Sequence, residues 1–148
     1  MARYQPHIIG EVYLFLRHES RVLLSRRFQT GYQDGNYSVP AGHMEGDEEV
    51  RAALIREARE EIGIELALDD LAVVGVMHSR FDSERVSFFV LAEHWRGEVR
   101  NMEPHKCDDL AWFEPNALPP NMVPLVRRAL ENLLAGRFYD SMGWDGPA

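Results

Sequence analysis

Residues 42–64 read GHMEGDEEVRAALIREAREEIGI, and this stretch decides both the fold and most of the chemistry that the chain can perform. Glu57, Glu60 and Glu61 are spaced so that, on an α-helix, their three carboxylates lie on one face. Like charges at this spacing destabilise an isolated helix, which indicates that a cation compensates them. Carboxylate oxygens at this density suit a hard divalent ion, so the stretch predicts a site for Mg²⁺ or Mn²⁺.

The negative charge of the chain is concentrated in the same stretch. Residues 45–61 contain seven acidic residues and three arginines, within a chain whose net charge is −8. A solvated helix face is the usual explanation of such a run and is the alternative here. Because binding to nucleic-acid polymers depends on a basic surface, the acidic balance argues against a nucleic-acid polymer as a partner.

Length and composition are typical of one soluble domain, which we expect to span residues 1–148. The first residues lack the regions of a signal peptide, and no apolar run is long enough to cross a bilayer. We therefore expect a cytoplasmic protein without a membrane partner. Cys107 is the only cysteine, which excludes a disulfide framework and a zinc site built from several thiolates.

Hydrophobic periodicity predicts strands mixed with two helices and no regular β-α-β alternation. This indicates an α+β fold, a mixed sheet with helices packed on its faces. The acidic helix should bury an apolar stripe from Val50 to Ile62 and end at Gly63, and the second helix should bury Val126, Leu130, Leu133 and Leu134. Residues 28–36 are expected to form a surface loop and residues 137–148 a tail. The predicted strands are Ile8–Arg17, Arg21–Arg27, Leu71–Ser79, Val86–Trp95 and Leu110–Phe113, and the predicted helices are Glu48–Ile62 and Val123–Leu134.

Hydrolysis of a phosphoanhydride is the reaction that fits this arrangement of carboxylates. The substrate is a polyanion and the protein is also anionic, so metal ions have to bridge the two, and a carboxylate can orient or deprotonate the attacking water. A backbone carbonyl from the turn at Ala41-Gly42 could add an oxygen ligand, because glycine lets the chain approach closely. The planar guanidinium of Arg56 can hold a carboxylate in one orientation, with a simple surface salt bridge as the alternative.

The same residues match a family pattern. The stretch resembles the Nudix box, G-x5-E-x7-R-E-U-x-E-E-x-G-U, in which U is a bulky aliphatic residue, and the small Ala58 at the first U position is the one departure. The resemblance identifies the chain as a MutT-like Nudix hydrolase and implies the Nudix α/β/α sandwich, with the box as a loop-helix-loop. It implies hydrolysis of a nucleoside diphosphate linked to another group. The matching positions are Gly42, Glu48, Arg56, Glu57, Glu60, Glu61, Gly63 and Ile64.

The resemblance also implies a set of metal ligands. Glu60 and Glu61 would be the principal ligands of Mg²⁺ or Mn²⁺, and Glu57 would be a further ligand or the general base. The Ala41 carbonyl would be an additional ligand. Family members often add a glutamate from outside the box, as a metal ligand or as the base, and Glu103 is the candidate in this chain.

Other residues of the box would position these ligands. Arg56 would orient a glutamate, and Glu48 would either support the metal ligands from behind or position the helix. Gly42 would form the turn that brings the Ala41 carbonyl to the metal, and Gly63 would end the helix.

Residues 95–113, WRGEVRNMEPHKCDDLAWF, followed by LPPN at 118–121, resemble a nucleoside-triphosphate diphosphatase branch with an N-x-E-P-x-K-C segment. That branch converts NTPs or dNTPs, sometimes modified, to the monophosphate and pyrophosphate. The proline that marks the ADP-ribose branch, the tyrosine of diadenosine-polyphosphate hydrolases and the NADH-type motif SQPWPFPxS are absent. A nucleotide sugar or another nucleoside diphosphate derivative is the alternative substrate. A nucleotide-binding module without turnover is a third interpretation.

Candidate contacts to the substrate lie outside the box. Arg80, Phe81 and Phe88 combine aromatic and polar groups, which commonly hold a base. Arg27, late in the second strand, could reach a phosphate. The alternatives are a core position for Phe88 and a solvated strand end for Arg27.

The end of the chain contains the aromatic residues Phe138, Tyr139 and Trp144. Exposed aromatic side chains favour interfaces, so a homodimer is one expectation. The same side chains could instead cap the core or close over the substrate pocket.

Overall fold

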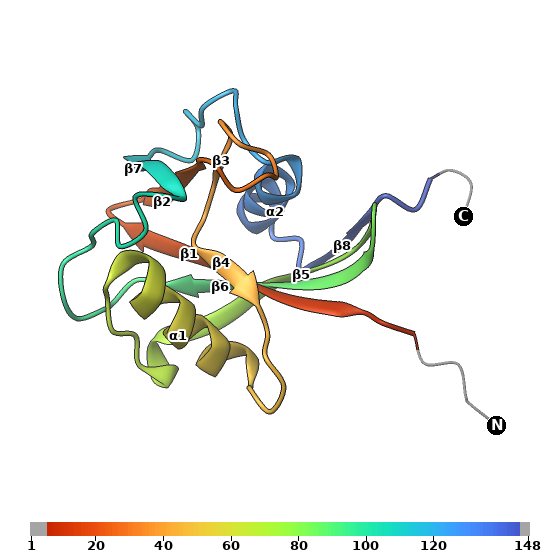
Figure 1. Ribbon diagram of the computed structural model, residues 1–148, viewed down its shortest axis with the longest axis horizontal. Coiled ribbons are helices and arrows are strands. Elements are labelled where there is room, and N and C mark those ends of the chain that lie inside the picture. The colour runs from red at the N-terminus through yellow and green to blue at the C-terminus, as the bar shows by residue number, and fades with distance from the viewer. Residues whose placement is uncertain (1–5, 146–148) are drawn as a thin grey trace.

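The computed structural model describes residues 6–145, whose strands join into one mixed eight-stranded sheet (Figure 1). The strand order is β3-β2-β1-β6-β5-β8, with β4 paired to β1 and β7 paired to β2. The pairs β1–β6 and β5–β8 are parallel, and the other pairs are antiparallel. The strands are β1 (Ile9–His18), β2 (Arg21–Arg27), β3 (Tyr37–Ser38), β4 (Ala41–His43), β5 (Leu71–Arg80), β6 (Glu84–Ala92), β7 (Cys107–Phe113) and β8 (Tyr139–Met142), and the helices are α1 (Val50–Ile62), the short 3₁₀ helix η1 (Leu68–Asp70) and α2 (Pro124–Ala135).

The two main helices cover opposite faces of the sheet, which confirms the predicted α/β/α sandwich (Figure 1). Alternate residues of a strand point to opposite faces. On β1, Val12 and Leu14 accordingly pack with α1, whereas Phe15 packs with α2. β1 therefore lies in the middle of two apolar clusters, and its neighbour β4 leads directly into the acidic helix.

Helix α1 has a signal at each end. Glu49 is the N-cap, and its carboxylate accepts hydrogen bonds from the backbone N–H groups of Arg51 and Ala52. Gly63 ends the helix in the left-handed conformation at φ 70°, as the sequence predicts. Ala58 is fully buried against the sheet, so the small residue at a bulky position of the box brings α1 close to the strands.

Two details of the predicted elements are wrong. Leu134, expected to face the core, is 60% exposed, because α2 buries Leu125, Val126, Ala129 and Leu130 instead. The segment expected to be a tail contains β8, which extends the sheet by pairing with β5. Residues 146–148 lie outside the described residues. Neither main helix in residues 6–145 is long and apolar enough to cross a membrane.

The aromatic residues around β8 have different environments. Phe138 and Tyr139 are 55% and 58% exposed. Trp144 packs against His78 in a tilted arrangement, with ring centroids 4.7 Å apart, and its indole N–H donates to the His78 carbonyl. The predicted homodimer remains a prediction.

Candidate active site

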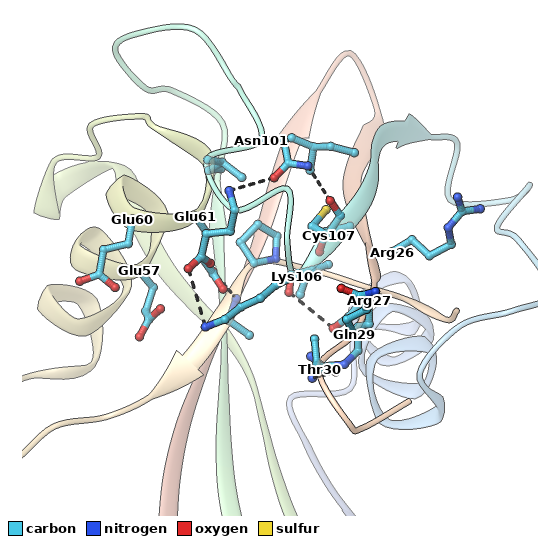
Figure 2. Close-up of a pocket in the computed structure, with 18 of the residues that line it drawn as sticks. Arg26, Arg27, Gln29, Thr30, Glu57, Glu60, Glu61, Asn101, Lys106 and Cys107 are labelled. Atoms are coloured by element: carbon cyan, nitrogen blue, oxygen red, sulfur yellow. Dashed lines mark hydrogen bonds and ion pairs between the residues drawn. The ribbon is translucent and has the colours of Figure 1, made fainter. Parts of the chain in front are cut away.

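A pocket of about 600 Å³ opens between α1 and the ends of β2 and β7 (Figure 2). Its two walls differ in charge. The wall formed by α1 is acidic, and the wall formed by β2 and the loop after it is cationic and polar. Figure 2 shows the two walls on either side of Lys106. The acidic wall contains Glu57, Glu60 and Glu61, and the opposite wall contains Arg26, Arg27, Gln29 and Thr30. Asn101, Glu103 and Lys106 line the pocket from the loop before β7, and Cys107 lines it from the first position of that strand.

Gly42 leaves the space that Glu57 occupies. In β4 it pairs with Val12 of β1, and a Cβ atom at this position would overlap the Glu57 carboxylate. The Glu57 side chain is only 12% exposed as a result of this close packing. The glycine of the box therefore has a steric role that the sequence did not reveal. Its predicted role in presenting the Ala41 carbonyl stays a prediction.

Arg56 connects the carboxylates of the box. Its Nε and Nη2 donate to the two oxygens of Glu48 at 2.8 and 3.0 Å, and Nη1 donates to Glu57 Oε1 at 2.8 Å. The same Nη1 lies 3.5 Å from Glu60 Oε2. The hydrogen bond from Arg56 lowers the pKa of Glu48, which also accepts from the backbone N–H of Glu45. The Arg56 side chain is only 22% exposed, unlike that of a simple surface pair, and the predicted roles of Arg56 and Glu48 stay predictions.

The surroundings of Glu57 and Glu61 disfavour the ionised form of both carboxyl groups. Burial raises the pKa of Glu61 well above its usual value, and the carboxylates of Glu57 and Glu103 raise it further. The backbone N–H of Ala41 donates to Glu61 Oε2 at 2.9 Å and opposes this shift. Burial also raises the pKa of Glu57, against the hydrogen bond from Arg56. A cation placed among these carboxylates would relieve the repulsion between them.

The loop before β7 is fixed to the end of α1. The backbone N–H of Arg100 donates to Ile62 O, and that of Met102 donates to Glu61 O, both at 3.0 Å. The side chain of Asn101 accepts from Glu103 N–H at 3.0 Å and donates to the Cys107 carbonyl at 2.7 Å, as the dashed lines in Figure 2 show. Glu103 is held beside the box in this way, close enough to raise the pKa of both Glu57 and Glu61.

The cationic wall depends on a loop that binds its own arginine. Arg27 donates from Nε to the Tyr32 carbonyl and from Nη2 to Thr30 Oγ1, and its guanidinium lies 5.3 Å from the centre of the Tyr32 ring. Asp34 accepts hydrogen bonds from Thr30 and from the backbone N–H of Gly31, and the bond from the Thr30 hydroxyl is the main reason that its pKa is lowered. Residues 27–34 therefore form a self-supported turn that presents Arg27 to the pocket.

Three of the predicted substrate residues lie away from this pocket. Arg80, at the end of β5, stacks over the Trp144 ring at 4.8 Å, and Phe81 is 61% exposed in the turn that follows. Phe88 on β6 packs against the α1 side of the core, which was the alternative for this residue. Only Arg27 of the four is brought to the pocket, because the β5–β6 turn extends away from α1 (Figure 1).

Several pocket residues were not singled out as site residues from the sequence. Arg26, Gln29 and Thr30 are close to Arg27 in the sequence. A strand end and a polar loop carry no pattern that predicts a pocket, so the sequence did not identify these residues. Asn101 and Lys106 lie in the segment that carries the resemblance to the triphosphate branch, which could have identified them. Cys107 is partly buried and also lines the pocket.

The residues present fit a divalent cation by their chemistry. The carboxylates are oxygen donors that repel one another, and Glu57, Glu60, Glu61 and Glu103 share one pocket. Among residues 6–145, no three His, Cys, Asp or Glu side chains are already arranged around one point as metal ligands. In this structure Glu57 and Glu60 contact Arg56, and Glu61 accepts a hydrogen bond from the Ala41 N–H.

Comparison with known proteins agrees with this site. The NUDIX domain family matches residues 9–133, so the chain belongs to the Nudix family. It is similar to the solved structure of a MutT NUDIX hydrolase from Burkholderia pseudomallei, with a TM-score of 0.77 and 28% identity over 86% of this chain and 98% of that one. It is also similar to the E. coli ORF135 protein, with a TM-score of 0.75 and 26% identity over 88% of this chain and 91% of that one.

The chain is also similar to longer proteins. The NAD-capped RNA hydrolase NudC of Pseudomonas aeruginosa is 31% identical over 129 residues, which are 87% of this chain and 44% of that protein. NudC of Pseudomonas putida is 31% identical over 99% of this chain and 50% of its own length. The chain thus spans about half the length of these relatives. Their name gives a capped RNA as substrate, so the expectation that excludes a nucleic-acid polymer receives no support from them.

Proposed function

We propose that this protein hydrolyses a phosphoanhydride bond of a nucleoside triphosphate in a reaction that depends on a divalent metal, and releases nucleoside monophosphate and pyrophosphate. One observation carries the proposal. Four carboxylates with mutual repulsion face a cationic wall across a pocket of about 600 Å³. A polyphosphate chain with a bound divalent cation carries charges that complement both walls.

In this proposal the metal ligands come from the box and from two residues outside it. Glu60 and Glu61 hold the metal, with Glu57, the Ala41 carbonyl and Glu103 as further donors. Bound Mg²⁺ or Mn²⁺ supplies charge neutralisation at the phosphate oxygens.

Two of the glutamates are candidates for the general base that takes a proton from the attacking water. Burial raises the pKa of Glu57, which favours uptake of a proton, and Arg56 orients its carboxylate. Glu103 is the other candidate, because it reaches the same pocket from the loop before β7.

The choice of a triphosphate is supported by the cationic wall. Arg27 lies opposite the carboxylates of α1, Lys106 lies between the two walls, and both can bind phosphate oxygens beyond those next to the metal. The described lining contains no aromatic side chain, so recognition inside this pocket relies on charge and hydrogen bonds rather than on stacking.

An NAD-type or NAD-capped substrate is the second candidate, because the NudC proteins are 31% identical to this chain. The absence of SQPWPFPxS from the sequence counts against it. A nucleotide sugar would also fit the acidic wall, but offers less negative charge to Arg27 and Lys106.

A substrate panel with Mg²⁺ tests the proposal. Nucleoside triphosphates, nucleotide sugars, NAD and an NAD-capped RNA are incubated with the protein, and the phosphate products are separated. We expect nucleoside monophosphate and pyrophosphate in equal amounts from a triphosphate. Orthophosphate as the first product, faster cleavage of NAD-capped RNA, or no product at all would each contradict the proposal, and the last outcome would favour a module without turnover.

The same reaction in ¹⁸O-labelled water locates the attack. Label only in the monophosphate identifies the α-phosphorus as the atom attacked by water, and label only in pyrophosphate identifies the β-phosphorus. Because the walls of the pocket do not determine which phosphorus lies next to the metal, this measurement assigns the bond that breaks.

A further inference from the structure

Lys106 is the only lysine in the chain, beside 15 arginines, and it lies inside the pocket. Arginine therefore supplies the positive charge everywhere else in the sequence. A lysine differs from arginine in carrying a compact charge on a flexible stem, which can follow a phosphate oxygen that moves. The position of this single lysine in the pocket is consistent with a contact to the substrate.

The backbone of Lys106 is fixed between the two walls of the pocket. Its N–H donates to the Glu103 carbonyl at 2.9 Å, within the turn that Asn101 closes. Its own carbonyl accepts from the backbone N–H of Phe28 at 3.0 Å, directly after Arg27 at the end of β2. The lysine thus starts from a defined point between the carboxylates and Arg27, and Figure 2 shows its side chain directed across the pocket.

The other cationic side chains of the described lining are already occupied. Arg56 is bonded to Glu48 and Glu57, Arg26 donates to Asp108 at 2.7 Å, and Arg27 donates to its own loop. Lys106 has one weak contact, with Nζ 3.9 Å from Glu103 Oε2, and its side chain is 57% exposed. Of these cations it is the one that can turn to a ligand at the least loss of existing hydrogen bonds.

We propose that Lys106 binds a phosphate of the substrate beyond the metal-bound group and leaves its resting contact with Glu103 when it does so. This inference rests on the proposed function and makes it more specific, because it requires a substrate with negative charge at that point. A nucleoside triphosphate meets this requirement, and a nucleotide sugar with a neutral distal group does not. Lys106 is then a specificity-determining residue, and Glu103 is released to the acidic wall when the substrate binds.

The first test compares Lys106→Met with Arg100→Met. Both changes remove one positive charge from the same loop, but Arg100 is exposed and does not line the pocket. We expect Lys106→Met to raise the KM for a nucleoside triphosphate about 10- to 100-fold, the effect of one lost charge-assisted hydrogen bond. Arg100→Met should leave KM unchanged, and Lys106→Arg should restore part of the affinity. Equal KM values for wild type and Lys106→Met would overturn the proposal.

The single lysine also allows a direct measurement of binding. Reductive ¹³C-methylation keeps its positive charge and gives one lysine resonance besides that of the N-terminal amine. A non-hydrolysable triphosphate analogue with Mg²⁺ should shift this resonance, and the uncharged nucleoside with Mg²⁺ should not. A resonance that stays in place when thermal shift shows saturation with the analogue would overturn the proposal.

The two proposals can fail separately. If the lysine resonance responds to the triphosphate analogue but no substrate is hydrolysed, Lys106 binds phosphate and the proposed hydrolysis is wrong. If triphosphates are hydrolysed but neither KM nor the resonance depends on Lys106, the proposed hydrolysis stands and the role of Lys106 is overturned.

Discussion

The acidic and the cationic walls of the pocket are built in different ways. The acidic wall comes from one continuous helix, where periodicity alone places Glu57, Glu60 and Glu61 together. The cationic side combines residues 26–30 with Lys106, which are far apart in the sequence and meet where β2 pairs with β7. The helix can therefore define a chemistry shared by many proteins, while the cationic wall can determine which substrate this chain selects.

Removal of a carboxylate from the acidic wall should have the largest effect. Glu61→Gln keeps the acceptor for the Ala41 N–H but loses the charge, and we expect kcat to fall about 100-fold or more. Because the change also removes repulsion from Glu57 and Glu103, the metal-free variant should unfold at a temperature equal to or above that of wild type. Steady-state kinetics and thermal unfolding measure both effects, and wild-type turnover by this variant would contradict the ligand assignment.

Gly42→Ala tests the space that the acidic wall needs. The added methyl group overlaps the Glu57 carboxylate, so we expect a loss of about 1–3 kcal/mol in the free energy of unfolding and a lower kcat. Gly46→Ala is the matched control, because nothing lies close to a Cβ atom at Gly46. Denaturant unfolding of the two variants should separate them, and equal stability would show that Glu57 has room to move aside.

The pH dependence of metal binding should follow the raised pKa of Glu61. A carboxyl group with a higher pKa in the folded than in the unfolded state favours folding at low pH, and this stabilisation is lost as pH rises through the folded value. The stabilisation by Mg²⁺ should therefore grow as pH rises through the raised pKa of Glu61, because the ion then meets ionised carboxylates. Thermal unfolding with and without Mg²⁺ measures this increase. In Glu61→Gln the increase should be smaller, and an identical profile in both proteins would contradict the assignment.

Asp34→Ala tests the cationic wall from its supporting loop and should have the smallest effect. Loss of the bonds from Thr30 and Gly31 frees the loop that holds Arg27, so we expect KM for a triphosphate to rise about 3- to 10-fold while kcat stays close to wild type. Asp69→Ala removes the same charge from η1, away from the pocket, and should leave both constants unchanged. A fall in kcat alone would mean that the two walls are not separable.

The sequence predicted the acidic wall well for a physical reason. The helix is a local structure, and its caps, buried stripe and carboxylate face all follow from spacing within residues 49–63. The steric role of Gly42 did not follow, because it depends on the approach of β4 to α1. The sandwich was predicted from the mixture of strands and helices and from the family pattern.

The cationic wall and the other substrate contacts were harder to predict, because they depend on tertiary structure. Arg80, Phe81 and Phe88 were chosen for their chemistry, but the β5–β6 turn carries the first two away from α1, and Phe88 faces the core. The strand β8 was missed because four residues next to a glycine-containing end give little periodic signal. Lys106 was visible in the composition as the only lysine, but only the contacts on both sides of its backbone show where it lies.

The acidic wall should act on turnover and the cationic side on substrate binding. The most direct test of these separate roles is to measure kcat and KM of Glu61→Gln and Lys106→Met with one nucleoside triphosphate at saturating Mg²⁺. We expect Glu61→Gln to lower kcat with a small change in KM, whereas Lys106→Met should raise KM with a small change in kcat. If both variants change the same constant by similar factors, the acidic wall and the cationic wall do not have separate roles in turnover and substrate binding.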